Sequence, residues 1–436
     1  MNYHDSERMA GLLERDGYRA AATEAEADVI VVNTCSVRER SVDKLYSRLG
    51  ELRDRWASRR DRPLVAVTGC VAQQEGERLL RRDRSVDVVL GTQRVADLPA
   101  LLRRARESGR AAVNINPRDD VQVPLGVARP SDPVRAWVTI IEGCNEYCAF
   151  CVVPYTRGHE RMRPVAEILA EVEEAARTGR REVQLLGQIV NHYLAPDEAG
   201  CDFAELLARV SAVPGITRVR FASPHPRHVS ARLIEALRDL PKVCKHLHLP
   251  VQSGSNRILN AMRRRYTREE YLDLVARARE AVPGVTISTD MIVGFPGETA
   301  ADFDRTLDLV GQVRYQAMYS FKYSPRPNTL ALKRMPDDVT EAEKARRLLE
   351  LQRLQGAIQA DWHASLVGTT AEVLVDGESR RRPWELAGRT SGNTVVNFPG
   401  PRLWVGRLLP VRIVEGGPNS LKGRVVDPPV AGGQSC

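Results

Sequence analysis

The first 115 residues alternate between short apolar runs and amphipathic stretches. Apolar runs at residues 28–33, 63–68 and 86–90 predict strands, and the stretches 6–16 and 36–56 predict helices. Strands that are apolar throughout and separated by helices are typical of a parallel sheet with both faces covered. The pattern therefore predicts a parallel α/β domain at the N-terminus.

After residue 134 the same alternation continues over a longer stretch. A proline-rich segment without periodicity, residues 116–133, predicts a linker before it. Strands are predicted at residues 135–141, 182–186, 217–221, 246–251, 286–293 and 316–321, and helices between them include 164–178, 267–282 and 299–313. A series of strands and helices of this kind predicts a partial or complete (β/α) barrel.

The pattern changes again near the C-terminus. Residues 340–366 predict one long helix, after which short alternating runs predict strands at 370–375, 384–389, 394–398, 408–414 and 423–426. Five strands in about sixty residues favour a small β-barrel of the OB type. The chain is thus predicted to be an α/β protein with three domains, at residues 1–116, 130–364 and 365–428.

Composition adds constraints on the class of protein. Hydrophobic residues make up 43% of the chain and charged residues 28%, which is typical of a globular protein. The net charge of +8 permits a nucleic-acid partner without requiring one. No apolar run reaches the roughly 18 residues of a membrane span, and residues 1–16 do not resemble a signal peptide. We expect a soluble cytoplasmic protein that does not enter a membrane.

Three of the eight cysteines lie close together, as Cys144, Cys148 and Cys151. Thiolates at this spacing suit an iron–sulfur cluster. Three ligands would leave one iron of a four-iron cluster open to a small molecule. A zinc site is the alternative, because His159 could complete a set of four ligands.

Further candidate residues follow the predicted strands. Cys35 and Cys70 come directly after the first and second strands, where parallel sheets collect ligands, so they form either a shared site or part of the core. In the predicted barrel, polar and glycine residues follow successive strands at 187–188, 223–226, 252–255 and 294–298. Their recurrence at strand ends predicts a lined pocket.

The stretch Gly143-Cys-Asn-Glu-Tyr-Cys-Ala-Phe-Cys-Val-Val-Pro-Tyr-Thr-Arg-Gly158 resembles the cluster loop of the radical S-adenosylmethionine methylthiotransferases. Further segments resemble this family at 33–39, 69–73, 185–188, 249–255, 289–298 and 323–327, so that the resemblance covers nearly the whole chain. The last domain is similar to the family's tRNA-binding β module, the TRAM domain. Within it, residues 388–390 and 395–398 resemble the branch that modifies tRNA bearing N6-isopentenyladenosine.

The resemblance implies two 4Fe-4S clusters and S-adenosylmethionine as cofactors. Cys144, Cys148 and Cys151 would hold the first cluster, whose open iron binds S-adenosylmethionine, and Cys35 and Cys70 would hold the second. The family's motif Gly-Cys-Gln-Met-Asn, matched to Met1-Asn2, puts a third ligand of the second cluster two residues before Met1. We therefore expect that the chain as given starts too late.

The resemblance also implies a reaction. Cleavage of S-adenosylmethionine gives a 5′-deoxyadenosyl radical, which removes hydrogen from C2 of an isopentenylated adenosine just 3′ of the anticodon. The second cluster then supplies sulfur, and a second S-adenosylmethionine supplies the methyl group. The partners would be a tRNA anticodon stem-loop and a reductase of the flavodoxin or ferredoxin type, and we expect a monomer.

Individual residues receive roles by their positions. Gln188, Asp290, Gly294 and Gly297 are the candidates for cofactor contact, and Arg389, Asn397 and Phe398 are the candidates for RNA contact. Tyr147, Phe150 and Tyr155 flank the cluster and either stack on RNA bases or pack around the loop. His225, His246 and His248 are interpreted as hydrogen-bonded core residues rather than pocket residues.

Two alternative functions remain beside this hypothesis. The first is a sister methylthiotransferase that acts on threonylcarbamoyladenosine in tRNA or on an aspartate of a ribosomal protein. The segment 395–398 speaks against both of these substrates. The second alternative, of another class, is a zinc-stabilised RNA-binding protein without catalytic activity.

Overall fold

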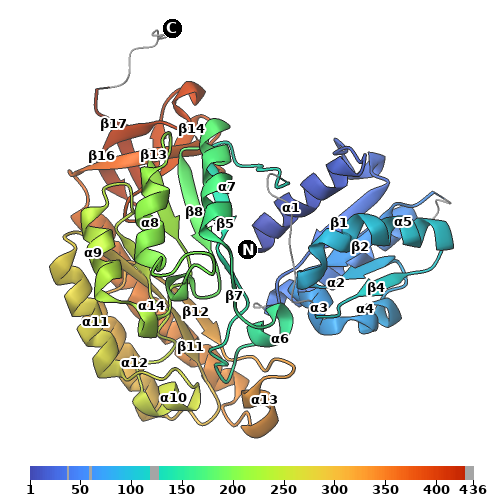
Figure 1. Cartoon of the computed structure of the whole chain (residues 1–436). Coiled ribbons are helices and arrows are strands. Elements are labelled where there is room, and N and C mark those ends of the chain that lie inside the picture. Colours follow the sequence, from blue (N-terminus) through green and yellow to red (C-terminus); the bar gives the residue numbers. More distant parts are fainter. Residues whose placement is uncertain (37–38, 58–60, 118–126, 428–436) are drawn as a thin grey trace.

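A computed structural model describes residues 1–36, 39–57, 61–117 and 127–427. The chain forms a mixed α/β structure with an N-terminal domain, a core domain and a C-terminal domain, which Figure 1 shows in blue, green to orange and red. Residue 428 and Cys436 lie outside the described residues, as does much of the predicted linker. The predicted fold class is confirmed.

The N-terminal domain is built on a parallel sheet of four strands in the order β1-β2-β3-β4. The strands are β1 (Val29–Asn33), β2 (Leu64–Thr68), β3 (Val88–Leu90) and β4 (Ala112–Asn114), and the last was not predicted because it has only three residues. The helices are α1 (Asn2–Arg15), α2 (Glu39–Trp56), α3 (Cys70–Glu75), α4 (Glu77–Arg82) and α5 (Leu98–Ser108). Apolar cores on both faces of the sheet explain its uniformly apolar strands.

The core domain is a partial barrel of six parallel strands. They are β5 (Arg135–Thr139), β8 (Glu182–Leu186), β9 (Arg218–Phe221), β10 (His246–His248), β11 (Thr286–Val293) and β12 (Ala317–Lys322). They form two three-stranded sheets, β5-β8-β9 and β10-β11-β12, linked by a parallel bridge between Val219 and Val243. The sheets contain no pairing between β5 and β12 in the described residues, so the barrel is open between them.

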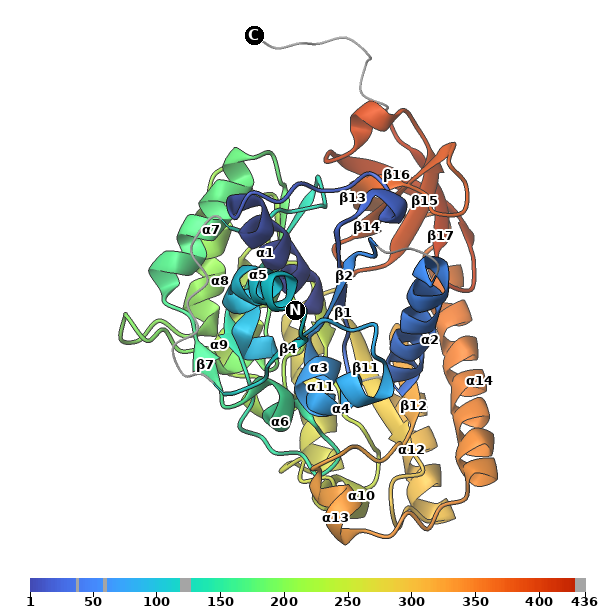
Figure 2. The same cartoon turned by 90° about the vertical axis from the view of Figure 1, so that its right-hand side faces the viewer.

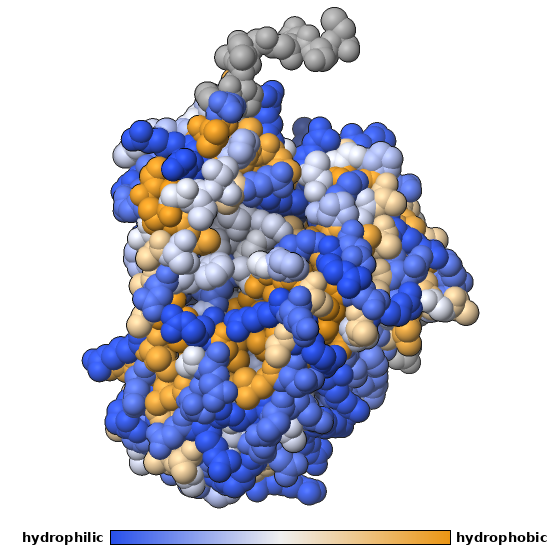
Figure 3. Space-filling view, turned by 90° about the vertical axis from the view of Figure 1, so that its left-hand side faces the viewer, coloured by the Kyte–Doolittle hydropathy of each residue, from blue (hydrophilic) through white to orange (hydrophobic). Residues whose placement is uncertain are grey.

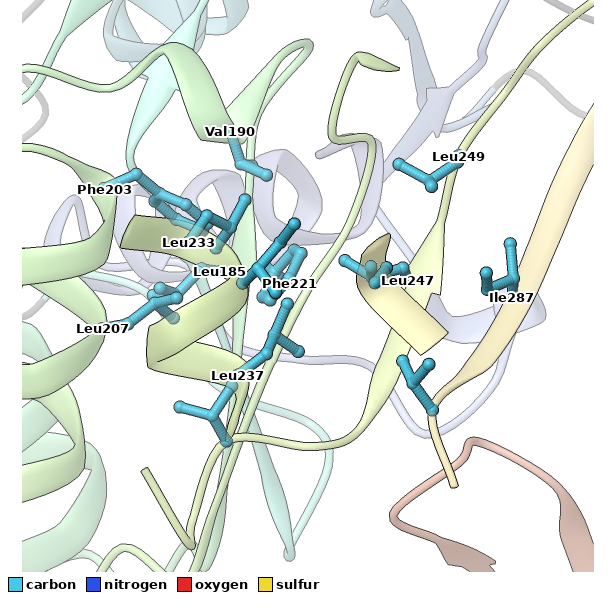
Figure 4. Close-up of a cluster of buried hydrophobic side chains, with 14 of the residues drawn as sticks. Leu185, Val190, Phe203, Leu207, Phe221, Leu233, Leu237, Leu247, Leu249 and Ile287 are labelled. Atoms are coloured by element: carbon cyan, nitrogen blue, oxygen red, sulfur yellow. The ribbon is translucent and has the colours of Figure 1, made fainter. Parts of the chain in front are cut away.

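Helices cover the outside of this barrel. They include α7 (Val165–Arg177), α8 (Phe203–Ala212), α9 (Ala231–Asp239), α11 (Arg268–Ala281) and α12 (Ala300–Val313). Side chains such as Phe203, Leu233 and Leu247 pack between helices and strands in the largest core (Figure 4). The face of the molecule seen in Figure 3 mixes hydrophilic areas with apolar patches.

The helix α14 (Glu341–Ser365) runs along the core domain and leads into the C-terminal domain (Figure 2). That domain is a closed barrel of β13 (Thr370–Glu378), β14 (Glu385–Thr390), β15 (Val395–Pro399), β16 (Leu408–Gly416) and β17 (Leu421–Val425). The predicted small β-barrel is therefore confirmed. Within the described ranges, no helix is both long and apolar enough to cross a bilayer.

The N-terminal domain is fixed to the core domain through α1, whose first residues lie beside β5 and β8 (Figure 1). The buried His4 has Nδ1 at 2.8 Å from the Thr139 hydroxyl of β5 and Nε2 at 3.1 Å from Glu171 of α7. Arg157 donates to Asp5 at 2.6 Å, and both side chains are 5% exposed. These contacts place the carboxyl end of β1 next to the carboxyl edge of the core barrel.

The C-terminal domain closes the opposite, amino-terminal end of the barrel. Glu182, at the start of β8, is fully buried and accepts from Arg135 and from Arg220, the latter at 2.8 Å. Burial alone would raise the pKa of Glu182, but the two arginines lower it below its usual value. The same arginines also contact the C-terminal domain. Arg135 lies 3.2 Å from Asp376, and Arg220 donates to the Thr390 carbonyl at 2.6 Å.

Removal of Glu182 tests the contribution of this buried network. In Glu182→Ala, two buried guanidinium groups lose their carboxylate, and we expect the free energy of unfolding to fall by about 3–5 kcal/mol. Glu174→Ala removes an exposed partner of Arg177 on α7 and should cost less than about 1 kcal/mol. Urea unfolding followed by circular dichroism measures both. Equal losses in the two variants would contradict the assigned role of Glu182.

Candidate active site at the carboxyl edge of the barrel

The three-cysteine loop lies between two short strands and a short helix. β6 (Ile141–Glu142) pairs with β7 (Arg161–Met162), and α6 (Val153–Arg157) follows the cysteines. Gly143 has φ of 80°, and a Cβ there would come within 2.0 Å of the His159 carbonyl, so the turn requires glycine. The Cys144 N–H donates to the Gly158 carbonyl at 3.2 Å, which fixes the start of the loop.

The three thiols have different surroundings. Cys144 is buried, whereas Cys148 and Cys151 are half-buried. Burial raises the pKa of Cys144 and of Cys151 to about 12. Arg264 is buried and donates from Nη1 to Cys148 Sγ at 3.3 Å and from Nη2 to the Pro250 carbonyl at 2.7 Å. Three thiols on one turn, with a cationic donor beside them, suit an iron–sulfur cluster whose iron replaces the protons.

The zinc alternative receives no support from this geometry. In the described part of the chain, no group of three or more His, Cys, Asp or Glu side chains is arranged to hold one metal ion. The ligand it needed, His159, has its Nδ1 at 3.3 Å from both Asn145 Oδ1 and the Tyr147 hydroxyl.

A buried glutamate in the loop ties it to the neighbouring strand ends. Glu146 lies 2.7 Å from His228 Nε2, after β9, and 3.5 Å from Arg227. It also lies 3.6 Å from Arg265, in the turn that carries Arg264. The hydrogen bond from His228 is the main cause that lowers the pKa of Glu146 below its usual value. The cluster loop is thus held from two sides.

The aromatic residues around the loop divide into two groups. Tyr147 and Tyr155 are 36% and 44% exposed and remain available for stacking. Phe150 packs against a small apolar cluster that includes Met262 and Phe295, as the packing interpretation expected. Tyr147 adopts φ of 49°, a left-handed conformation that is uncommon for residues other than glycine.

Cys35 and Cys70 meet at the carboxyl ends of β1 and β2. Their side chains are hydrogen-bonded to each other, and this contact lowers the pKa of Cys70 to about 6. The amino group of Met1 lies close enough to both to be affected by their charge. Arg157, at the end of α6, also lowers the pKa of Cys70. Its guanidinium thus links this pair of cysteines to the three-cysteine loop. The structure therefore brings the two cysteines together at one edge of the sheet.

The strand-end residues predicted for cofactor contact all lie at the carboxyl edge. Gln188 follows β8, contacts the Met1 sulfur, and has a buried Oε1 without a partner among the described residues. Asp290, on β11, lies 3.4 Å from His248 Nε2. Gly294 and Gly297 have φ of 69° and 78°, and a Cβ on Gly294 would come within 2.3 Å of the Lys344 side chain. The turn itself therefore explains these two glycines.

The histidines are only partly explained as core residues. His246 and His248 both bond the Ser288 hydroxyl at 2.9 Å, but they also line a cavity inside the barrel. His225 is 5% exposed and accepts at Nδ1 from the Arg227 N–H, and its Nε2 has no partner in the described residues. The alternate positions of His246 and His248 in β10 were the signal that these two face the lumen.

The cavity in the barrel lumen has a volume of about 340 Å³. Its lining includes inward-facing residues of five strands and one residue of the C-terminal domain: Trp137, Gln184, Arg220, His246, Tyr319 and Asn393. We call this cavity the lumen chamber. Sequence patterning did not find it, because the inward positions of the strands are polar and were not distinguished from exposed ones.

The three residues predicted for RNA contact lie in different environments. Arg389 is 34% exposed at the interface with the core domain, 3.5 Å from Asp376. Asn397 is half-buried and donates to the Ser420 hydroxyl at 3.1 Å. The expectation for Phe398 is wrong, because its side chain is 0% exposed in the apolar core of the C-terminal barrel.

Comparison with known proteins assigns each domain to a family. Residues 138–310 match the Radical SAM superfamily, residues 1–91 match Uncharacterized protein family UPF0004, and residues 364–426 match the TRAM domain. A solved radical S-adenosylmethionine methyltransferase, TsrM from Kitasatospora setae, superposes with a TM-score of 0.55 at 16% identity, over 75% of this chain and 73% of that one. This likeness supports the fold alone.

Curated relatives match over nearly the full length. A protein of Alkalilimnicola ehrlichii is 47% identical over 431 residues, 98% of this chain and 95% of that protein. A protein of Geobacter metallireducens is 46% identical over 426 residues, 98% of this chain and 96% of its own. Both are named tRNA-2-methylthio-N(6)-dimethylallyladenosine synthase.

The contact between Arg264 and Cys148 generates a prediction about iron retention. Arg264→Gln removes a cationic donor to the sulfur, and we expect reconstituted protein to lose iron to a chelator about 10-fold or more faster. Arg263→Gln is the matched control, because Arg263 is exposed in the same turn. Iron release is followed with a ferrous-ion dye. Identical rates for both variants would show that Arg264 does not support the site.

Proposed function

The chain belongs to the radical S-adenosylmethionine family of tRNA-2-methylthio-N(6)-dimethylallyladenosine synthases, and we propose that it methylthiolates C2 of N6-isopentenyladenosine (the same N6-dimethylallyl nucleoside) next to the anticodon in tRNA. The enzyme is a tRNA methylthiotransferase that inserts sulfur and transfers a methyl group. The observation that carries this proposal is identity of 47% over 98% of the chain, with the three-cysteine loop at the carboxyl edge of the barrel.

Cys144, Cys148 and Cys151 hold a 4Fe-4S cluster that leaves one iron for S-adenosylmethionine. When both are bound, the cluster and S-adenosylmethionine would supply a 5′-deoxyadenosyl radical, which can remove hydrogen from an unactivated C–H bond such as that at C2 of adenine. The chain's own residues fix the loop: Arg264 donates to Cys148, and Glu146 anchors the turn to His228. Gln188, Asp290, Gly294 and Gly297 are proposed to contact the cofactor, because they lie at the same edge.

A second 4Fe-4S cluster is proposed at Cys35 and Cys70, as the source of the inserted sulfur. Its support is the meeting of the two thiols at neighbouring strand ends and their link to α6 through Arg157. In the family's motif a third cysteine precedes the residue that corresponds to Met1. The two sites are brought together by α6, which follows the three-cysteine loop and contacts α3, the helix that begins at Cys70.

The C-terminal domain is proposed to bind the anticodon stem-loop. Arg380, Arg381 and Arg382 follow β13 in one exposed loop, beside Trp384, which is 73% exposed. Arginines neutralise phosphates and an exposed indole offers a stacking face, a combination that single-stranded RNA loops bind. Arg389 and Asn397 stay in this proposal as candidates for RNA contact, while Phe398 supports the barrel core instead.

The other partners follow from the chemistry. Reductive cleavage of a sulfonium needs an electron, which we assign to a reductase of the flavodoxin or ferredoxin type. Thiolates that hold clusters need a reducing compartment, which supports action in the cytoplasm. The chain is proposed to act as a monomer. The sister activity on threonylcarbamoyladenosine is disfavoured, because the curated relatives reported above are named for the dimethylallyl nucleoside.

Cysteine replacements separate the two clusters. They are made in a chain with Gly-Cys-Gln added before Met1, which completes the family's motif. We expect about eight irons per chain after anaerobic reconstitution and about four in Cys70→Ala. Cys70→Ala should still cleave S-adenosylmethionine but form no methylthio group, whereas Cys151→Ala should do neither.

The control for these variants is Cys201→Ala, since Cys201 is buried in the core far from either cysteine group in sequence. It should keep about eight irons and form product. Iron is measured colorimetrically, and the modified nucleoside by mass spectrometry of digested tRNA. Full methylthiolation by Cys70→Ala would contradict the assignment of the sulfur source.

The arginine loop predicts a change in salt dependence. Arg380→Ala with Arg381→Ala removes two phosphate contacts, so the slope of log K against log salt for tRNA should become shallower by about 1.5. Arg177→Ala with Arg238→Ala removes two exposed arginines from α7 and α9 and should leave the slope unchanged. Fluorescence anisotropy at several salt concentrations measures both. An unchanged slope in the first pair would place the RNA elsewhere.

A further inference from the structure

The lumen chamber lies directly beneath the carboxyl edge and is not needed to hold either group of cysteines. In a complete (β/α) barrel the interior is filled by layers of branched apolar side chains. Here the inward positions of successive strands are Trp137, Gln184, Arg220, His246 and Ser288, and space remains between them. A hollow lumen with polar walls indicates a compartment for a ligand rather than a packed core.

The floor of the lumen chamber is supplied by the C-terminal domain. The loop after β14, residues 391–393, enters the amino-terminal end of the barrel, and Asn393 with φ of 66° lines the chamber. Thr286 and Gln316 donate to the Gly392 carbonyl at 2.9 and 2.8 Å. A Cβ on Gly392 would lie within 2.8 Å of Thr286. The RNA-binding domain therefore sets the depth of a cavity in the catalytic domain.

Arg220, the cation that lines the chamber, is already bonded at the floor. Arg220 donates to Glu182, to the Thr390 carbonyl and to the Ser391 carbonyl at 3.1 Å. Burial lowers the pKa of His246 to about 3, so this ring is uncharged at neutral pH. Asp290 adds negative charge nearer the carboxyl edge. Because an unpaired buried charge is costly, the chamber favours an uncharged occupant.

The lining of the lumen chamber includes residues of β5 and β12, the two unpaired edge strands of the barrel. Tyr319 of β12 is 53% exposed there and makes an edge contact with His248, with ring centroids 6.0 Å apart. Trp137 of β5 lies on the other side. An exposed tyrosine on a barrel strand is unusual for a core position, and it offers a face on which a flat heteroaromatic ring can stack.

From these observations we propose that the lumen chamber holds the N6 substituent of the target adenosine, and that Asn393 and the loop around it limit the size of that substituent. The inference rests on the proposed function, which requires C2 of the adenine to face the cluster at the carboxyl edge. C2 and C6 lie on opposite sides of N1 in the purine ring. Because the exocyclic bonds at C2 and C6 diverge, an adenine with C2 toward the edge directs N6 away from the cluster, and the substituent enters the chamber when it is rotated away from N1.

This assignment gives the C-terminal domain a second role. It binds the stem-loop from outside and also forms the end of the pocket that reads the modification. A branched hydrocarbon substituent leaves every floor hydrogen bond intact. A threonylcarbamoyl substituent carries a carboxylate, for which the described lining offers no cation that is not already bonded to Glu182 or to backbone carbonyls.

The experiment compares binding of two anticodon stem-loops that differ only in the isopentenyl group. Wild-type protein should bind the isopentenylated RNA more tightly than the unmodified RNA. Ala222→Phe fills the chamber from its wall and should reduce that preference by about 10-fold or more, with the dissociation constant for unmodified RNA unchanged. Ala357→Phe places the same ring on the exposed face of α14 and should keep the full preference.

A second variant tests the floor by gain of binding. Asn393→Gly suits the positive φ and lengthens the chamber, so RNA with an N6-benzyl group should bind this variant several-fold more tightly than it binds wild type. The proposal is overturned if Ala222→Phe keeps the wild-type preference for isopentenylated RNA. If Ala222→Phe binds neither RNA, the proposal is overturned when Asn393→Gly shows no gain in binding of the N6-benzyl RNA. Methylthiolation by wild type without any preference for the isopentenyl group also overturns it, whereas failure of wild type to methylthiolate overturns the proposed function instead.

Discussion

The buried carboxylate of Glu182 is the interaction on which the arrangement of the core and C-terminal domains depends. Two guanidinium groups, from Arg135 and Arg220, are brought to the amino-terminal end of an open barrel, where desolvation would be prohibitive without a counter-charge. Glu182 supplies one charge, and the carbonyls and Asp376 of the C-terminal domain supply the remaining acceptors. The docking of one domain is therefore part of the charge balance of the other, and the two are expected to move as one body.

At the other end of the barrel, a comparable role falls to Arg157. It follows the three-cysteine loop in sequence, yet its guanidinium bonds Asp5 and Asn2 of the N-terminal domain and acts on Cys70. Burial makes this pairing specific, because neither charge can be left without its partner. The two groups of cysteines are consequently fixed relative to each other. A reaction that generates a radical at one site and takes sulfur from another needs such a fixed separation.

Most of the elements could be predicted because local patterns determine them. Apolar strands in alternation with helices gave the three folds, and the spacing of Cys144, Cys148 and Cys151 is a local signal that does not depend on tertiary structure. Phe398 was misassigned because a motif marks resemblance without saying which side of a strand faces inward. The β6–β7 pair and β4 were missed because two or three residues carry too little periodicity. The lumen chamber depends on contacts between residues about 170 positions apart, such as Arg220 with Ser391, and sequence patterns do not report these.

The closed end of the barrel also bears on how the enzyme could separate related nucleosides. Discrimination is strong where a substrate would leave buried polar groups unpaired, and weak where it only adds or removes hydrocarbon. In the proposed pocket, the guanidinium of Arg220 is already bonded at the floor, so an uncharged substituent displaces none of its hydrogen bonds, while a carboxylate arrives without a partner. Selection against charged N6 substituents would then follow from groups that the preferred substrate does not touch. The groups proposed to maintain this selection, Glu182 and the loop of Ser391, are separate from the cysteines proposed to hold the clusters.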